Sequence, residues 1–350
     1  MIVSTYESRP FDLTGVKLLV VSLARHCHDL PVEFSCPKLD TDFARWLARF
    51  PHVHVRERPE LERHGWNIKP TLLLELLEAG HDEVLWIDAD VIVHRDFRRL
   101  LAGLPHDTLV STEEPDWGQD EGGTHRTVSW GLVPARDMER TVNSAVLRVT
   151  AAHRELLRRW RELLETSDYR AAQARPWYER PIHLLGDQEV LTALLASSEF
   201  AHVPVRLLRR GRDILQSFSP TTYTLRERLH NGLHGLPPLV HAMRQKPWRY
   251  SRMPSLAREP RRYYHLVYLE LSPYTHVARA YRDELGEDAD WMDIRTVPAK
   301  VLQVLAGGSV NLQGVPHVLI GHALRPLRRL ARRIPGGVGP SSGRDDVPAP

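Results

Sequence analysis

An apolar run that ends on two carboxylates limits the fold of this chain more than any other feature. Residues 84–87 are all apolar, which is typical of a buried strand, and Asp88 and Asp90 follow directly. Side chains two positions apart on an extended chain point to the same face, so these carboxylates converge. Converging carboxylates repel each other unless a cation lies between them, and oxygen ligands suit Mg²⁺ or Mn²⁺. The alternative is a strand end with two solvated acids.

Strand and helix patterns alternate before this run. We expect the first strand at residues 16–23, a helix at 41–50, a short second strand at 52–55, and a helix from Pro70 to Gly80. This alternation predicts an α/β fold with a mostly parallel sheet and crossover helices. Ligands of such sheets bind beyond the carboxyl ends of the strands, which is where the acidic pair lies.

The later part of the chain has weaker patterns. We expect strands at 108–111, 142–149 and 239–241, helices at 150–164 and from Gly186, and a long polar loop at 113–130. Residues 251–334 have helical patterns and would form a C-terminal extension. Residues 335–350 are rich in Gly, Pro and Ser, which predicts a disordered tail.

The composition fits a globular protein, since 42% of the 350 residues are hydrophobic and 26% are charged. A formal net charge of +3 is too small to indicate nucleic acid as a partner. The two cysteines, Cys27 and Cys36, favour a reducing cytosol over a disulfide scaffold. The polar N-terminus lacks the layout of a signal peptide, and no apolar run approaches the ~20 residues that cross a bilayer.

An apolar stripe surrounded by arginines lies within residues 320–334. One interpretation is a weak peripheral contact with the anionic inner face of a membrane. The other is packing of this stripe on the main domain.

His241 and Lys246 are candidates for completing the cation site. His241 ends a short apolar run, where a histidine is often only packed or hydrogen-bonded, but imidazole is also a ligand for Mn²⁺. Lys246 could neutralise a terminal phosphate as a point charge. Each signal is weak alone, and the two become specific together with the upstream acidic pair.

Three further segments have both a structural and a functional interpretation. Asn143 and Ser144 fit a turn before a strand, or a contact between an amide and a sugar hydroxyl. Asp187 and Gln188 fit a helix start, or a carboxylate and an amide that face a sugar ring. Lys69 fits an ordinary loop-to-helix segment, or a contact with a donor sugar or phosphate.

Taken in order, these segments resemble the motifs of the GT-A fold nucleotide-sugar glycosyltransferases, especially the glycogenin-like glycosyltransferase family 8. The motifs are Lys69, Asp88-Ala89-Asp90, Asn143-Ser144-Ala145, Gly186-Asp187-Gln188, and His241 with Lys246-Pro247-Trp248. The resemblance covers about residues 16–250. It implies a Rossmann-like GT-A fold, with a catalytic domain that we place at residues 14–250.

The resemblance also implies a retaining hexosyltransferase that takes a sugar from a nucleoside diphosphate, usually UDP, with Mn²⁺ or Mg²⁺ as cofactor. By this analogy the metal ligands are Asp88, Asp90 and His241, and the catalytic candidates are Asp187 and Gln188. The donor-binding residues are Ser22, Leu23, Lys69, Asp88, Asn143, Ser144 and Lys246. Ser22 and Leu23 would border the nucleotide base at the end of the first strand.

Two departures from the family pattern affect this assignment. The segment from His241 to Lys246 is one residue shorter than usual and lacks the usual Gly, so Arg244 is a second candidate for the role of Lys246. The third motif has Ala145 where many members have Gly, which tightens the space beside the sugar.

Two alternatives to a transferase remain open from the sequence. A haloacid-dehalogenase-like phosphatase would use Asp88 as its nucleophile, although its acidic motif normally opens the domain. A non-catalytic nucleotide-sugar-binding module would keep the fold without turnover. The acceptor of a transferase could be a glycan, a lipid-linked saccharide, a natural product or a protein.

Overall fold

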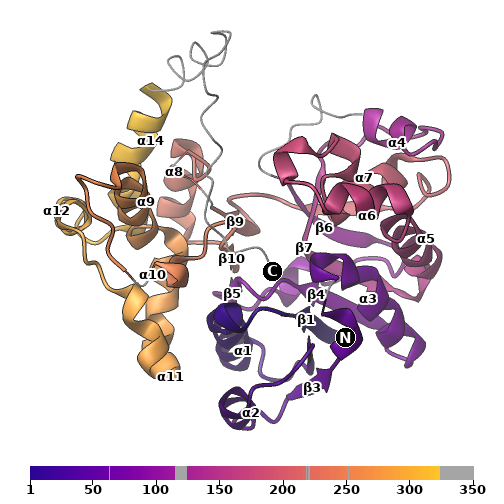
Figure 1. Ribbon diagram of the computed structural model, residues 1–350, viewed down its shortest axis with the longest axis horizontal. Helices are drawn as coiled ribbons and strands as arrows, with labels where there is room; N and C mark the ends of the chain where they lie inside the picture. The colour runs from indigo at the N-terminus through magenta and orange to yellow at the C-terminus, as the bar shows by residue number, and fades with distance from the viewer. Residues whose placement is uncertain (63, 115–123, 218, 220, 251, 324–350) are drawn as a thin grey trace.

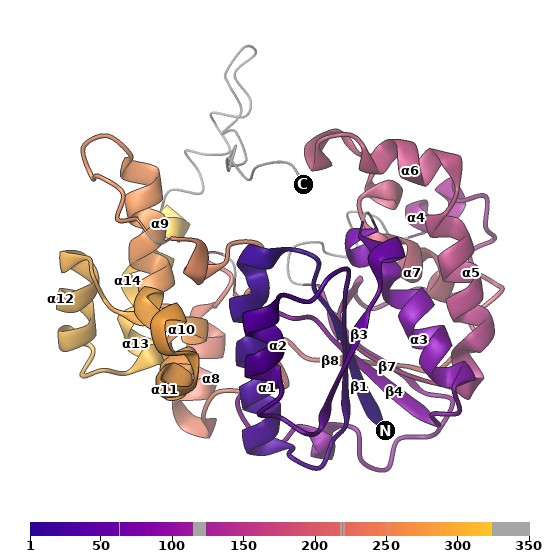
Figure 2. The same cartoon turned by 60° about the horizontal axis from the view of Figure 1, so that its bottom comes forward.

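The computed structural model of the protein describes residues 1–62, 64–114, 124–217, 219, 221–250 and 252–323. A seven-stranded sheet with helices on both faces forms its centre, and the C-terminal helices lie beside it (Figures 1 and 2). The strand order is β3-β2-β1-β4-β7-β6-β8. These strands are β1 (Ile2–Tyr6), β2 (Val32–Cys36), β3 (Val53–Glu57), β4 (Glu83–Ile87), β6 (Leu109–Glu113), β7 (Val142–Thr150) and β8 (Val205–Leu208).

The pairings of this sheet are parallel except those of β7, which runs antiparallel to both β4 and β6. A second sheet contains β5 (Val91–Val93), β10 (Leu239–His241) and β9 (Ile214–Gln216) in that order. The strand β10 is antiparallel to β5 and parallel to β9. The predicted α/β class with a mostly parallel sheet is therefore confirmed.

Alternating side chains of the central strands pack into different cores on the two faces. Val84 and Trp86 belong to the core beneath α3, α5 and α7, whereas Leu85 and Ile87 belong to the core beneath α1. Figure 2 shows α1 and α2 on one side of the sheet and α3, α5, α6 and α7 on the other. These helices are α1 (Leu13–His26), α2 (Thr41–Leu47), α3 (Lys69–Glu78), α5 (Arg154–Leu164), α6 (Ser167–Gln173) and α7 (Asp187–Ala196).

The prediction of a first strand at residues 16–23 is wrong, because this segment lies inside helix α1. Three separate cores surround the helix: Leu18 and Val21 pack into one, Leu19 and Leu23 into another, and Val20 into a third. A helix that is apolar on several sides shows no clear 3.6-residue period and reads like a buried strand. The first strand of the sheet is β1, which begins before residue 14, where we expected the domain to start.

Most of the other predicted elements are present. The helices α2, α3, α5 and α7 and the strands β3, β4, β6, β7 and β10 occur where the patterns predicted them. The strands β2, β5, β8 and β9 were not predicted, and neither was β1. The predicted loop at 113–130 contains a short helix, α4 (His125–Ser129), while its residues 115–123 lie outside the described part of the chain.

The residues after 250 are mainly helical as far as residue 323, in agreement with the predicted extension. Within the described ranges, none of the helices is long and apolar enough to cross a membrane. The predicted tail at 335–350 and residues 324–334 of the arginine-rich stripe lie outside the described residues. The helices of this region are α9 (Pro260–Glu270), α10 (Pro273–Ala278), α11 (Arg282–Leu285), α12 (Val297–Leu305), α13 (Val310–Gln313) and α14 (Val315–Ala323), and α8 (Leu225–His234) precedes it, before β10.

Candidate functional site

The acidic pair lies at the junction between the two sheets. Asp88 directly follows β4, and its backbone N–H donates to the carbonyl of Ala145 on β7 at 2.8 Å. Asp90 directly precedes β5, and its carbonyl accepts from the N–H of Ala242 at 3.1 Å. The backbone on both sides of the pair is therefore fixed by strand pairing.

Pairing within the small sheet brings His241 to the same place. In the antiparallel register of β5 and β10, His241 lies opposite Val91, the residue after Asp90. Its Nε2 atom is 3.3 Å from Oδ1 of Asp90. One ligand atom from each of Asp88, Asp90 and His241 lies within 4.8 Å of the others, so the three predicted metal ligands converge.

This donor set fits a divalent cation. Two carboxylates and an imidazole suit Mn²⁺, and both acids are only partly exposed. Oδ1 of Asp88 accepts from Nε1 of Trp86 at 2.6 Å and lies 3.1 Å from Nζ of Lys69, so Oδ2 is its remaining oxygen for a cation. Asp88, Asp90 and His241 could therefore hold a metal between them.

Lys246 reaches the acidic pair despite the shortened segment that precedes it. Its ammonium group pairs with Oδ2 of Asp90 and donates to the carbonyl of Ala242 at 2.7 Å. Arg244 adopts a left-handed backbone conformation with φ of 59°, a conformation that favours glycine. The segment therefore makes its turn without the glycine of the family pattern. The guanidinium of Arg244 lies over the ring of Trp177, with 5.4 Å between them.

Lys69 joins the acidic pair to Asp187. Its buried Nζ donates to Oγ of Ser144 at 2.7 Å and lies 3.5 Å from the Asp187 carboxylate. Ser144 in turn donates to Oδ2 of Asp187 at 2.8 Å. Burial lowers the pKa of Lys69, but the charges of Asp187 and Asp88 outweigh it and raise that pKa above its ordinary value. Lys69 therefore stays charged and compensates two acids.

Asp90 is compensated in the same way. Burial raises the pKa of its carboxyl group, but the charges of Lys246 and His241 outweigh burial and hold that pKa well below its usual range. Asp90 is therefore a carboxylate at neutral pH, which is the form that a metal ion requires.

A second hydrogen-bonded group of polar side chains joins β7 to the end of β6 and the start of α7. Nδ2 of Asn143 donates to Oε2 of Glu114 at 2.8 Å and to Oε1 of Gln188 at 3.1 Å. Nε2 of Gln188 donates to the same Glu114 oxygen at 2.9 Å, and Oδ1 of Asn143 accepts from Thr112 at 3.1 Å. Gln188 is only half-buried, while Asn143 lies beneath it in the core.

The structure does not place Ser22 and Leu23 at a strand end. Both are fully buried inside α1, and Oγ of Ser22 donates to the carbonyl of Leu19 at 2.9 Å and accepts from the N–H of Val93 at 3.0 Å. The prediction that they border a nucleotide base depended on the strand at 16–23, which is a helix. Ser22 instead joins α1 to the small sheet.

The sequence interpretation missed two residues near the site. Glu114 directly follows β6 and binds Asn143 and Gln188, but its position in a polar segment gave no signal. Arg9 follows β1, pairs with Glu7 at 2.8 Å and Asp12 at 3.0 Å, and lies within electrostatic reach of Asp90. The β-branched residues Ile2, Val3 and Thr5 were the sequence signal for the strand that leads to Arg9, but they do not alternate with polar residues.

No protein-family model matches this sequence, and no curated protein matches it significantly. The fold is similar to that of the galactosyltransferase LgtC. A structure of LgtC in complex with donor and acceptor sugar analogs has 15% identity and a TM-score of 0.50, over 81% of this chain and 100% of that chain. An active-site mutant of LgtC has 16% identity and a TM-score of 0.50, over 80% and 96%. The chain therefore has the GT-A fold.

Proposed function

We propose that this protein is a metal-dependent glycosyltransferase that moves a sugar from a nucleoside diphosphate donor to an acceptor. The proposed donor is a UDP-sugar. The main support is the convergence of Asp88, Asp90, His241 and Lys246 at the carboxyl end of β4. Three ligands for a cation and one ammonium group for phosphate, gathered from segments 150 residues apart in sequence, form a site for a diphosphate–metal complex.

In this proposal Asp88, Asp90 and His241 would hold Mn²⁺ or Mg²⁺, which would supply positive charge to the diphosphate of the donor. Lys246 pairs with Asp90 and would set its ammonium charge against the terminal phosphate of the donor. A divalent cation held by Asp90 would then compensate this carboxylate in place of Lys246.

Asp187 and Gln188 have different roles in this proposal. The carboxylate of Asp187 is buried and already binds Ser144 and Lys69, so we assign it to positioning. The side chain of Gln188 is half-buried and held by Glu114 and Asn143, and we assign its amide group to contact the donor sugar. An amide there would support an oxocarbenium-like transition state and a transfer with retention of configuration.

We also propose that the strands and helices up to residue 250 form the catalytic part and that the helices from residue 260 onward form an extension. The phosphatase alternative has less support, because Oδ1 of its nucleophile Asp88 is bound by both Trp86 and Lys69. A binding module without turnover would use the same cation and nucleotide site, and only a turnover assay separates it from the enzyme.

The proposal is tested by UDP release from a panel of UDP-sugars with and without Mn²⁺, after isothermal titration with UDP. We expect UDP to bind only with Mn²⁺ and at least one UDP-sugar to be turned over. Asp90→Asn should lower Mn²⁺-dependent turnover by about a hundredfold or more, as expected for a lost ligand. The control is Asp82→Asn, which removes an exposed acid just before β4.

Equal Mn²⁺-dependent turnover in Asp90→Asn and the unchanged protein would remove Asp90 from the metal site. Tight binding of UDP with Mn²⁺ but no turnover of any donor, with or without added sugars, would favour the binding module. Release of phosphate from an aryl phosphate that is lost in Asp88→Asn would favour the phosphatase.

A further inference from the structure

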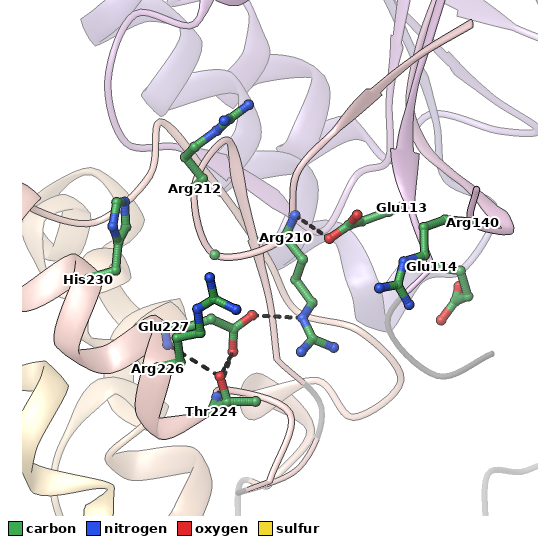
Figure 3. Close-up of a pocket in the computed structure, with 10 residues that line it drawn as sticks. Glu113, Glu114, Arg140, Arg210, Arg212, Thr224, Arg226, Glu227 and His230 are labelled. Carbon is green, nitrogen blue, oxygen red and sulfur yellow. Dashed lines mark hydrogen bonds and ion pairs between the residues drawn. The ribbon is translucent and has the colours of Figure 1, made fainter. Parts of the chain in front are cut away.

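A pocket of about 430 Å³ adjoins the proposed reaction centre. It lies between the ends of β6 and β7 and the first turn of α8, and Figure 3 shows its lining side chains. Glu114 connects the two regions, because it lines this pocket and its carboxylate binds Asn143 and Gln188. A molecule in the pocket would therefore lie next to the side chain that we assign to the donor sugar.

The carboxylates of this pocket are already engaged. Oε1 of Glu113 accepts from the N–H of Arg210 at 2.9 Å, and Oε1 of Glu227 accepts from Nε of Arg210 at 2.7 Å. Glu114 accepts from the amides of Asn143 and Gln188. These contacts leave the acids of the pocket occupied by groups of the protein.

Two arginines of the pocket form no such contact with its carboxylates. Arg140, just before β7, and Arg226, in the first turn of α8, are both exposed. Neither forms an ion pair with any residue that the structure describes. In Figure 3 their side chains extend from opposite walls of the pocket. The pocket is therefore lined from two sides by guanidinium groups that form no ion pair with the described residues.

The wall that carries Arg226 has a fixed shape. Gly211 has φ of +77°, and a Cβ atom added there would lie 2.5 Å from Cγ of Glu227. Glu227 accepts from the backbone N–H of Thr224 at 2.6 Å and completes the capping box of α8. The ion pair of Arg210 with Glu227, at 2.7 Å, joins this turn to the helix start, which reduces the ordering cost of binding a ligand.

We infer that the acceptor of the proposed glycosyltransferase carries an anionic group, a phosphate or a carboxylate, which Arg140 and Arg226 bind in this pocket. Guanidinium groups bind both anions through paired hydrogen bonds, and the pocket volume falls in the range of small-molecule sites. The inference rests on the proposed function, since only a transferase has an acceptor.

The inference is tested by binding of three probes that share one sugar ring and differ in the group at C6: glucose 6-phosphate, glucuronic acid and glucose. Ligand-detected NMR in the presence of UDP and diamagnetic Mg²⁺ measures their affinities, and UDP release from the active donor measures their use as acceptors. We expect one or both charged probes to bind about tenfold more tightly than glucose, as for one charge-assisted contact. Comparison of the two charged probes distinguishes phosphate from carboxylate.

The double variant Arg140→Gln/Arg226→Gln should abolish this preference and its dependence on ionic strength. The matched control is Arg170→Gln, an exposed arginine on α6 outside the pocket, which should keep the preference. Equal binding of glucose and the charged probes, or a preference that survives in the double variant, would overturn the inference even where donor turnover is normal. Absence of all UDP-sugar turnover would instead refute the proposed function, and with it the role of this pocket as an acceptor site.

Discussion

Replacement of Lys69 by methionine tests the charge arrangement behind the acidic pair. Lys69 is 3% exposed, and its Nζ lies 3.1 Å from Asp88 and 3.5 Å from Asp187. The same atom donates to Oγ and to the carbonyl of Ser144, at 2.7 and 3.2 Å. Methionine occupies a similar volume, so the substitution removes the charge and these hydrogen bonds without a large cavity.

We expect Lys69→Met to lower the free energy of unfolding by about 3 kcal/mol. Removal of one partner from a buried ion pair costs about 3–5 kcal/mol, because the remaining charge is left buried and unpaired. The lower end applies because Asp88 has 27% of its side chain exposed and can regain water, whereas Asp187 has only 8% exposed. Lys69→Met/Asp187→Asn should therefore be less destabilised than the sum of the single variants, by about 1 kcal/mol or more.

Equilibrium urea denaturation, with midpoint and slope fitted for each variant, measures these differences. The control is Lys38→Met, at an exposed lysine, which should change stability by less than about 0.5 kcal/mol. Mn²⁺ should stabilise Lys69→Met more than the unchanged protein, because a cation replaces the lost charge beside Asp88. A cost below about 1 kcal/mol for Lys69→Met, or strict additivity in the double variant, would refute the assignment of Lys69 as the shared partner of two buried acids.

Two further predictions concern parts of the fold away from the metal site. Gly211→Ala should destabilise the protein more than Gly235→Ala in thermal unfolding. Both glycines have positive φ, but only a Cβ atom at Gly211 would meet Glu227, at 2.5 Å. Equal decreases in the unfolding temperature of the two variants would contradict this. Stability should fall as the pH drops from about 6.5 to about 4, because burial lowers the pKa of His153 to about 4 while the unfolded chain takes up its proton first. The neutral ring accepts from the N–H of Thr150 at 2.9 Å. In His153→Asn, the decrease in the free energy of unfolding between pH 7 and pH 4 should therefore be about 3 kcal/mol smaller than in the unchanged protein, as measured by urea denaturation at each pH.

The sequence was sufficient to predict the elements whose apolar residues form one short run or one face of a helix. The run at 84–87 is short, apolar and followed by acids, so both its strand and its carboxyl end were recognisable. The helix α5 has a strongly one-sided apolar face, and Thr150 caps the short 3-10 turn that leads into it, so this helix was also predicted. In each case the local pattern agrees with the final environment of the element.

The first strand was predicted within helix α1 and the true first strand, β1, was missed, and both errors have a physical reason. Local periodicity reports burial on one side, but α1 is in contact with three cores and looks apolar throughout. The strand β1 has five residues, and its Ser4 and Thr5 are fully buried, so it resembles a polar terminus in sequence. Only the pairing of β1 between β2 and β4 reveals it as a central strand, and that pairing is not encoded locally.

The metal ligands could be proposed from sequence, but the means by which His241 reaches the acids could not. The strands β5 and β10 have only three residues each, and their pairing places His241 opposite Val91. A slip of one residue would turn every side chain of β10 to the other face. Such a slip is opposed because Ile92 and Val240 pack into one core while Val91, Val93 and Leu239 pack into another. Residues that touch neither metal nor donor therefore determine the distance between His241 and Asp90, and with it the geometry of the proposed cation site.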